Sequence, residues 1–357
     1  MAKLVSPQIS VTFTELGISA ITRGDKGTVA LIVRDGLEVD PAFAITQATQ
    51  IPDALGKETV DYIKRTFLGY VNPPKKVIVY VLAPEGRLAD ALDYLATTVF
   101  DYICGPADCT AEEAADIASW VKSQRLNNGA KYKAVLPNHK ADNYAIVNFT
   151  GDAMTDGITV WDTAAYCSRV AGLLAGTPMK IAATYAPLPE LSDCARLTKE
   201  EADEAVGSGE LALRWDGRKV KLNRAVNSLV TTSQGMLDSF KKIKIVEIMD
   251  LIRTDISATA EDEYIGKYAN TYDNKLLLIT AIRGYFMGLE QSQLVKSGYT
   301  VDLDVDRIEQ YLMSRGVNTD EMSESEIREA DTGSHVFIIV RCKILDAIED
   351  IFIEVEI

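Results

Sequence analysis

The sequence contains few of the residues that usually mark a catalytic or metal-binding protein. Its 357 residues include only two histidines, His139 and His335, and neither lies in an HExxH motif or beside cysteines at zinc-ligand spacing. Five cysteines are scattered along the chain, and the closest two, Cys104 and Cys109, have no second pair. This pattern disfavours a zinc site and a disulfide framework, and it is typical of buried thiols in a reducing compartment. We therefore expect no bound metal.

Motifs for cofactor binding and covalent catalysis are also missing. The chain has no Walker A sequence, no GxGxxG and no GxSxG. The nearest fragment, GDKGT at 24–28, precedes a predicted strand, whereas a phosphate-binding loop follows one. Asn148-Phe149-Thr150 matches a glycosylation acceptor, but it lies in a predicted strand, so a chance match is the better interpretation. We expect neither a cofactor nor a catalytic residue.

Long apolar runs and excess positive charge are absent as well. No run approaches the ~20 residues that a membrane span needs, and MAKLVSPQIS has no apolar core of a signal peptide. We therefore expect no membrane insertion, and a chain that stays in the cytoplasm while it folds. The formal net charge of −15, from 52 acidic and 37 basic residues, argues against general nucleic-acid binding.

Apolar strand-like runs alternate with helical patterns in the first half of the chain. Helices are predicted around Leu88–Val99, after the capping box formed by Thr110 and Glu113, and at 163–175. This order indicates an α/β layer with some parallel pairing. The predicted strands are 28–33, 76–82, 131–136, 144–149 and about 180–185.

The pattern changes after a proline- and glycine-containing region at 187–209, which we interpret as a domain boundary. A hairpin is predicted at 210–222, and three helices are predicted around 245–256, 278–289 and 304–315. The acidic stretch 302–331 contains DLDVD, a fragment of a calcium loop without the glycine and the closing glutamate. A solvated acidic face is therefore the better interpretation.

Both ends of the chain have the alternation of a half-buried strand. Residues 8–14 and 336–344 are predicted strands, and 351–357 (IFIEVEI) is a third, with isoleucine and valine on one face and two glutamates on the other. These strands either form edges of the protein's own sheet or complete the sheet of a neighbouring subunit. Glycine-containing segments set both ends apart, which favours the second alternative. The predicted intersubunit residues are Ile9, Val11, Phe13, Val340, Cys342, Ile344, Ile351, Ile353, Val355 and Ile357.

Three segments resemble the contractile phage tail sheath proteins, above all the short sheath proteins of defective prophages and R-type bacteriocins of Gram-positive bacteria. KLNRAVNSLVTTS (221–233) followed by FKKIKIVEIMDLIRTDI (240–256) resembles the family's Asn-centred strand, Lys-rich strand and apolar helix. The run 170–175 (VAGLLA) resembles a helix that closes the outer domain, and RGDKGTVALIV resembles the start of the short members.

The resemblance implies an overall α+β fold with an outer α/β domain and an inner mixed domain. The expected divisions are an N-terminal arm at 1–26, the outer domain at 27–195, the inner domain at 196–334 and a C-terminal β arm at 335–357. The implied function is structural: hexameric rings of subunits stack around a tail tube and contract to drive the tube through a target envelope. Neighbouring arms would join into shared sheets.

The resemblance also implies partners and a location. The partners are other copies of the chain, a tail tube protein, a baseplate and a tail terminator, with no nucleic acid. Assembly would take place in the bacterial cytoplasm, and the final location would be the tail of a released particle. Charged tube contacts are expected from the helices 275–296 and 304–315, with Lys296, Arg307 and Arg315 as candidates. The rivals are a type VI-like sheath, a non-contractile baseplate or capsid component, and an α/β enzyme.

Overall fold

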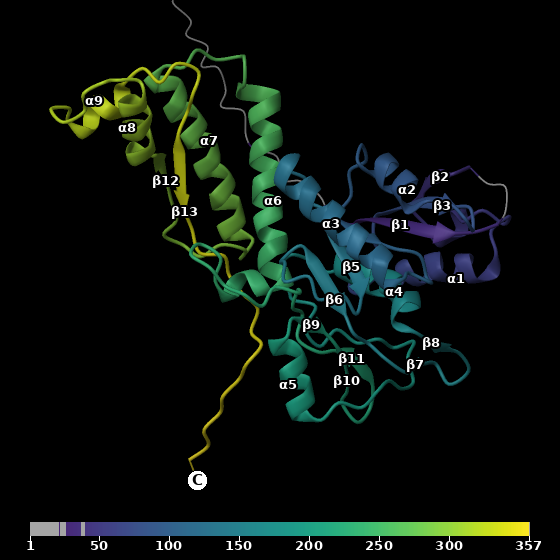
Figure 1. Cartoon of the computed structure of the whole chain (residues 1–357). Helices are drawn as coiled ribbons and strands as arrows, with labels where there is room; N and C mark the ends of the chain where they lie inside the picture. Colours follow the sequence, from purple (N-terminus) through teal and green to yellow (C-terminus); the bar gives the residue numbers. More distant parts are fainter. Residues whose placement is uncertain (1–20, 22–25, 37–39, 357) are drawn as a thin grey trace, which may run out of the picture. The chain divides into compact units, whose positions relative to one another are not determined.

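The computed structural model describes residue 21, residues 26–36 and residues 40–356. It contains two compact units, which we describe separately (Figure 1). The larger, here called the sheet unit, consists of the described residues in Gly24–Thr254, Ser292–Lys296 and Ile344–Ile357. The smaller, here called the α7 unit, includes Asp255–Gln291 and Ser297–Lys343.

The division between the units falls inside a helix. Helix α6 (Ile243–Thr259) begins in the sheet unit, and its last turn belongs to the α7 unit. Residues 196–254, which the sequence assigned to the inner domain, therefore pack with the strands of the first half of the chain. The composition change at 187–209 coincides with loops and helix α5 (Lys199–Gly207) inside the sheet unit.

A seven-stranded sheet forms the centre of the sheet unit, in the order β2-β3-β1-β4-β5-β6-β9. All neighbouring strands are parallel except the edge strand β2, which is antiparallel to β3. The α/β layer expected from the sequence is confirmed. The strands are β1 (Thr28–Arg34), β2 (Ala42–Ile45), β3 (Lys76–Leu82), β4 (Tyr102–Cys104), β5 (Lys133–Pro137), β6 (Ile146–Phe149) and β9 (Glu210–Leu211).

Both faces of this sheet are buried, which explains why its strands are continuously apolar. In β1, Val29, Leu31 and Val33 enter one hydrophobic core, and Ala30 and Ile32 enter the other. Helices α2 and α3 cover one face, and α1 and α4 cover the opposite face (Figure 1). These helices are α1 (Lys57–Thr66), α2 (Leu88–Leu95), α3 (Ala111–Asn127) and α4 (Thr163–Ala175).

Two glycines allow the backbone of α4 to lie in direct contact with the backbone of neighbouring segments. A Cβ added to Gly172 would lie 1.9 Å from the carbonyl oxygen of Thr66 in α1. A Cβ added to Gly176, which caps α4, would lie 1.9 Å from the carbonyl oxygen of Asn72. The VAGLLA run is therefore buried helix that packs against α1.

Short hairpins and single turns complete the sheet unit. Strands β7 (Met154–Thr155) and β8 (Val160–Trp161) form one hairpin, and β10 (Leu213–Trp215) and β11 (Val220–Leu222) form the predicted one. The 3₁₀ turns are η1 (Ala48–Gln50) and η2 (Asp238–Lys241).

The α7 unit packs helices against a two-stranded antiparallel sheet. Its core includes Ile282, Phe286 and Leu289 of α7 together with Ile308 and Leu312 of α8. A π-helical turn, Ala260–Tyr264, follows α6. The other elements are α7 (Tyr272–Gln291), β12 (Thr300–Leu303), α8 (Val305–Ser314), α9 (Glu324–Glu329) and β13 (Ile338–Arg341).

Several sequence predictions are wrong in detail. No strand forms at 180–185, where Tyr185 has a φ of 58° and the chain turns between Ala183 and Ala186. The Lys-rich strand expected within 240–256 does not form, because this segment comprises the end of η2, Lys242 and most of α6. Strand β2 was not predicted because it has only four residues. Helix α1 was missed although its buried residues Tyr62, Ile63 and Thr66 have helical spacing.

Candidate functional site

The C-terminal segment 351–356 exposes its apolar side chains to solvent. Ile351, Phe352, Ile353 and Val355 are 72%, 94%, 80% and 75% exposed, and none of residues 351–356 belongs to a strand. The predicted alternation is present in the sequence, but no strand among the described residues pairs with it. A strand needs hydrogen-bond partners for its backbone and a surface to bury its apolar face. This segment is therefore the most evident unfilled interface of the described chain.

Residues 336–344 differ from residues 351–356 in their pairing. Their central part forms β13, which pairs with β12 inside the α7 unit, so that Val340 lies opposite Val301. Ile344 forms an isolated bridge with Val295, and Cys342 is exposed. Val340 thus has a partner within its own chain. Ile9, Val11, Phe13 and Ile357 lie outside the described residues.

The β12–β13 sheet has open edges. Each of its strands pairs with one other strand among the described residues, so each leaves one row of backbone N–H and C=O groups without a strand beside it. An open edge of a sheet is a template for another strand. The α7 unit therefore offers an acceptor for strand addition.

The predicted tube-contact residues are exposed but do not share one element. Arg307 lies in α8, and Arg315 follows its last turn and donates from Nε to the Tyr311 hydroxyl at 3.3 Å. Lys296 lies five residues beyond the end of α7, in the sheet unit, so the expected helix 275–296 ends earlier than predicted.

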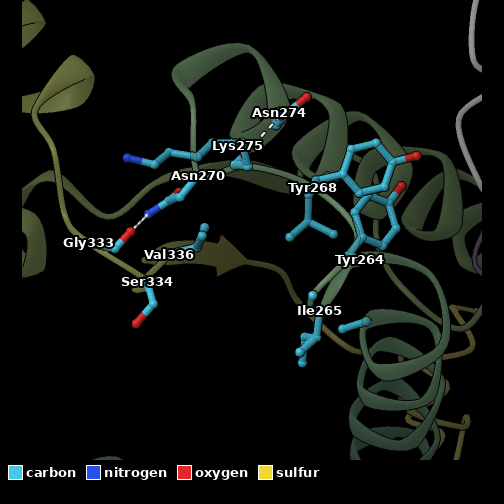
Figure 2. A pocket seen from close by; sticks show the side chains of 13 residues that line it. Tyr264, Ile265, Tyr268, Asn270, Asn274, Lys275, Gly333, Ser334 and Val336 are labelled. Atoms are coloured by element: carbon cyan, nitrogen blue, oxygen red, sulfur yellow. Dashed lines mark hydrogen bonds between the residues drawn. The ribbon is translucent and has the colours of Figure 1, made fainter.

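A pocket of about 730 Å³ opens in the α7 unit beside the π-helical turn (Figure 2). The rings of Tyr264 and Tyr268 stack there with centroids 5.5 Å apart, and Ile265, which is 68% exposed, lies beside them. On the other side, the amide of Asn270 donates to the carbonyl oxygen of Gly333 at 2.7 Å. The lining is mainly apolar, and its polar side chains include those of Asn274, Lys275 and Ser334.

A buried ionic cluster joins the first half of α6 to the sheet. Asp250 accepts two hydrogen bonds from Arg125 of α3, at 2.6 and 3.1 Å, and lies 3.1 Å from the Nζ atom of Lys133 in β5. Glu247, one turn earlier, lies 3.0 Å from the Nζ atom of Lys26. We call Lys26, Arg125, Lys133, Glu247 and Asp250 the α6 ionic cluster.

The charges of this cluster compensate for burial. Burial alone would raise the pKa of Asp250, but the neighbouring Lys133 and Arg125 cations outweigh it and hold that pKa below its usual value. Burial likewise opposes the charge on Lys133, and the carboxylates of Glu247 and Asp250 raise its pKa in spite of it. Such a cluster fixes α6 on the sheet, because any single charge left without its partner in this interior is costly.

The remaining acidic and polar candidates have structural roles. Asp302 of the DLDVD run is paired with Arg328 of α9, and Asp304 caps α8 through the amide of Arg307. Asn148 is fully buried in β6 and is inaccessible to glycosylation. Within residues 26–36 and 40–356, no three His, Cys, Asp or Glu side chains are arranged to hold a metal ion, and no helix has the length and apolar character to cross a membrane.

Two sequence families match the chain. The model of the phage tail sheath protein central domain matches residues 84–228, and that of the phage tail sheath C-terminal domain matches residues 238–357. The tail sheath protein of Clostridium phage phiCD119 is 38% identical over 361 residues, covering 100% of both chains. XkdK of the Bacillus subtilis phage-like element PBSX is 31% identical over 47% of this chain and 38% of its own length.

Solved structures show the same fold at low sequence identity. The sheath tail protein Lin1278 from Listeria innocua has a TM-score of 0.67 at 16% identity, covering 90% of this chain and 96% of that one. The helical sheath of the anti-feeding prophage in its contracted state has a TM-score of 0.68 at 13% identity, covering 98% of both chains. The resemblance seen in the sequence is confirmed, and the chain belongs to the phage tail sheath protein family.

Proposed function

We propose that this tail sheath protein polymerises as stacked hexameric rings around a tail tube and contracts to drive the tube through a target cell envelope. The observation that carries the proposal is the exposed apolar alternation of residues 351–356, in a chain that also contains a sheet with open edges. One copy provides the strand and another provides the edge, so the two features are complementary between subunits. Residues 8–14 would supply the second arm of the same lattice.

The energetics favour ordering of the arm only on assembly. Burying the side chains of Ile351, Ile353, Val355 and Ile357 contributes about 6–12 kcal/mol as an upper value. Ordering seven residues costs about 7–14 kcal/mol of backbone entropy. These contributions nearly cancel, so the hydrogen bonds to a neighbouring strand decide the outcome. The exposed segment of the single chain agrees with this balance.

Truncation after Asp350 tests the arm. We expect the truncated subunit to remain folded, because residues 351–356 bury little surface, but to form no tubes or rings in negative-stain microscopy. Ile353→Asp should have the same effect in the full chain, since it places a charge on the face to be buried. Glu354→Gln, on the opposite face, is the matched control and should assemble normally. Normal tubes from the truncated protein would refute the arm, and a subunit that fails to fold would place the strand in its own core.

We further propose that Arg307 and Arg315 face the tube, with Lys296 as a third contact. Their exposure supports this assignment. Each exposed charge contributes at most about 1 kcal/mol, but the contacts repeat in every subunit. Reversing both arginines to glutamate should leave sheath self-assembly intact and abolish co-assembly on purified tubes.

The remaining proposals follow from membership of the family. The proposed divisions are those expected from the sequence: an outer domain at 27–195, an inner domain at 196–334 and an arm at 335–357. Residues 196–254 of this inner domain pack in the sheet unit, and within the arm the exposed apolar side chains that follow Asp350 are the part offered to a neighbour. A baseplate and a tail terminator would bound the sheath, assembly would occur in the bacterial cytoplasm, and the particle would then be released. The protein would act without a catalytic step or a cofactor. The alternative function is that of a sheath in a type VI-like or other contractile injection system, which would assemble through the same contacts between subunits.

A further inference from the structure

The residues just before the exposed arm are held firmly by the sheet unit. Glu349 is the centre of this attachment, and its side chain is only 6% exposed. Its carboxylate lies 3.0 Å from the Nζ atom of Lys242 and accepts a hydrogen bond from the Thr184 hydroxyl at 2.5 Å. The Nε atom of Arg224 lies 3.8 Å away. A carboxylate is rarely buried to this extent without such partners, so Glu349 occupies a specific binding site on the sheet unit.

Two further acids strengthen the same attachment. Asp346 pairs with Lys242, and Asp350 pairs with Arg224. Upstream, the amide of Leu345 donates to the carbonyl oxygen of Leu294 at 2.8 Å. Residues 344–350 are therefore attached at several points, whereas the apolar side chains that follow are at least 72% exposed. The change from held to free chain occurs between Asp350 and Ile351.

The cations that hold the segment are themselves fixed. Lys242 immediately precedes α6, whose first half is anchored by the α6 ionic cluster. Thr184 is oriented by the amide of Ala225, which donates to its hydroxyl oxygen at 3.0 Å. Among the described residues, every ion pair of Lys242 and Arg224 is made to the C-terminal segment. The charges of these two side chains therefore stabilise the position of the C-terminal segment.

From this geometry we propose that Lys242, Arg224 and Thr184 form a root clamp that sets the direction in which the C-terminal arm leaves the subunit. The clamp acts as a positioning device, because it touches residues 346–350 and not the strand that a neighbour would receive. A strand presented in one direction loses less freedom on binding than a freely jointed one, so the clamp pre-organises assembly. This inference rests on the proposed function of the arm.

The test uses the full chain and Lys242→Met. In the isolated subunit, hydrogen exchange followed by mass spectrometry should show lost protection at residues 344–350, with β1 and β3 still protected. Sedimentation should show a critical concentration for assembly raised about tenfold or more, as expected when pre-organisation is lost. Lys242→Arg should restore both. Lys241→Met is the matched control: the adjacent Lys241 pairs with Asp238 at 2.9 Å, away from the segment, and its loss should change neither measurement.

Several outcomes would overturn the root clamp. One is unchanged protection at 344–350 in Lys242→Met, and another is lost protection with normal assembly. Arg224→Gln is a milder second variant, and loss of protection throughout the sheet in both variants would make these residues fold stabilisers instead. Failure of the proposed function gives a separate signature, because truncation after Asp350 would then leave assembly normal in a subunit whose clamp is intact.

Discussion

Removal of one charge from the α6 ionic cluster should destabilise the sheet unit strongly. Lys133 is 3% exposed, and its Nζ atom lies 3.1 Å from Asp250 and 3.7 Å from Glu247. Lys133→Met keeps most of the side-chain volume but leaves the two acids with fewer cations. Breaking a buried ion pair by removing one partner costs about 3–5 kcal/mol. Asp250 keeps Arg125 and Glu247 keeps Lys26, so we expect the lower end, about 3 kcal/mol.

Urea unfolding, followed by tryptophan fluorescence, measures this loss of stability in the sheet unit. The chain has three tryptophans, Trp120, Trp161 and Trp215, and all three belong to the sheet unit. With an m-value of about 3 kcal/mol/M, a loss of about 3 kcal/mol lowers the urea midpoint by about 1 M. The measurement therefore reports the sheet unit without interference from the α7 unit.

Lys140→Met is the matched control for this prediction. Lys140 also forms an ion pair, at 2.9 Å from Glu210, but its side chain is 69% exposed. Exposed pairs often contribute nothing measurable, so this variant should unfold at the wild-type midpoint. If Lys133→Met shifts the midpoint no more than Lys140→Met does, the α6 ionic cluster does not stabilise the docking of α6, and the reasoning from burial is wrong.

Two further predictions concern packing and pH. Gly172→Ala should destabilise the protein by about 3 kcal/mol in thermal unfolding, because the added methyl group meets the backbone of α1, whereas Gly207→Ala has open space around it and should be neutral or slightly stabilising. The pKa of Asp250 is lower in the folded state than its unfolded value of about 3.9. The ionised carboxylate therefore contributes to the free energy of unfolding above about pH 3.9, and this contribution is lost as the pH falls through the folded pKa. Stability should therefore decline in acid below about pH 4, and less steeply in Asp250→Asn.

Regular elements were predictable from the sequence where one period dominates. The buried strands β1 and β3 and the capping box of α3 follow from local patterns, and the structure has them within one or two residues. The C-terminal alternation is equally regular, yet residues 351–356 form no strand in the single chain. A periodic sequence specifies which side chains share a face, but a strand also requires a second strand, which here would belong to another molecule.

The ionic contacts could not be predicted, because they join residues far apart in the chain. Asp250 meets Arg125 across 125 residues, and Glu349 meets Lys242 across 107. A signal for the first contact was nevertheless present: Glu247 and Asp250 lie among the apolar residues of α6, and Lys133 begins an otherwise apolar strand. Charges at positions that periodicity assigns to a core indicate a buried ion pair, although not which residues form it.

The β7–β8 hairpin has a consequence for engineering. Its tip is closed by the Asp156 carboxylate, which accepts hydrogen bonds from the amides of Ile158 and Thr159, and Ile158 is 94% exposed. A foreign peptide inserted after Gly157 would leave the strand pairs of the hairpin in place, and a Cβ at Gly157 would have only the Ser192 hydroxyl within 4 Å, as exposed loop tips generally allow. Because every subunit of a polymer carries the same tip, one genetic insertion would be copied at a regular spacing, and an epitope or enzyme attached there would become a multivalent array.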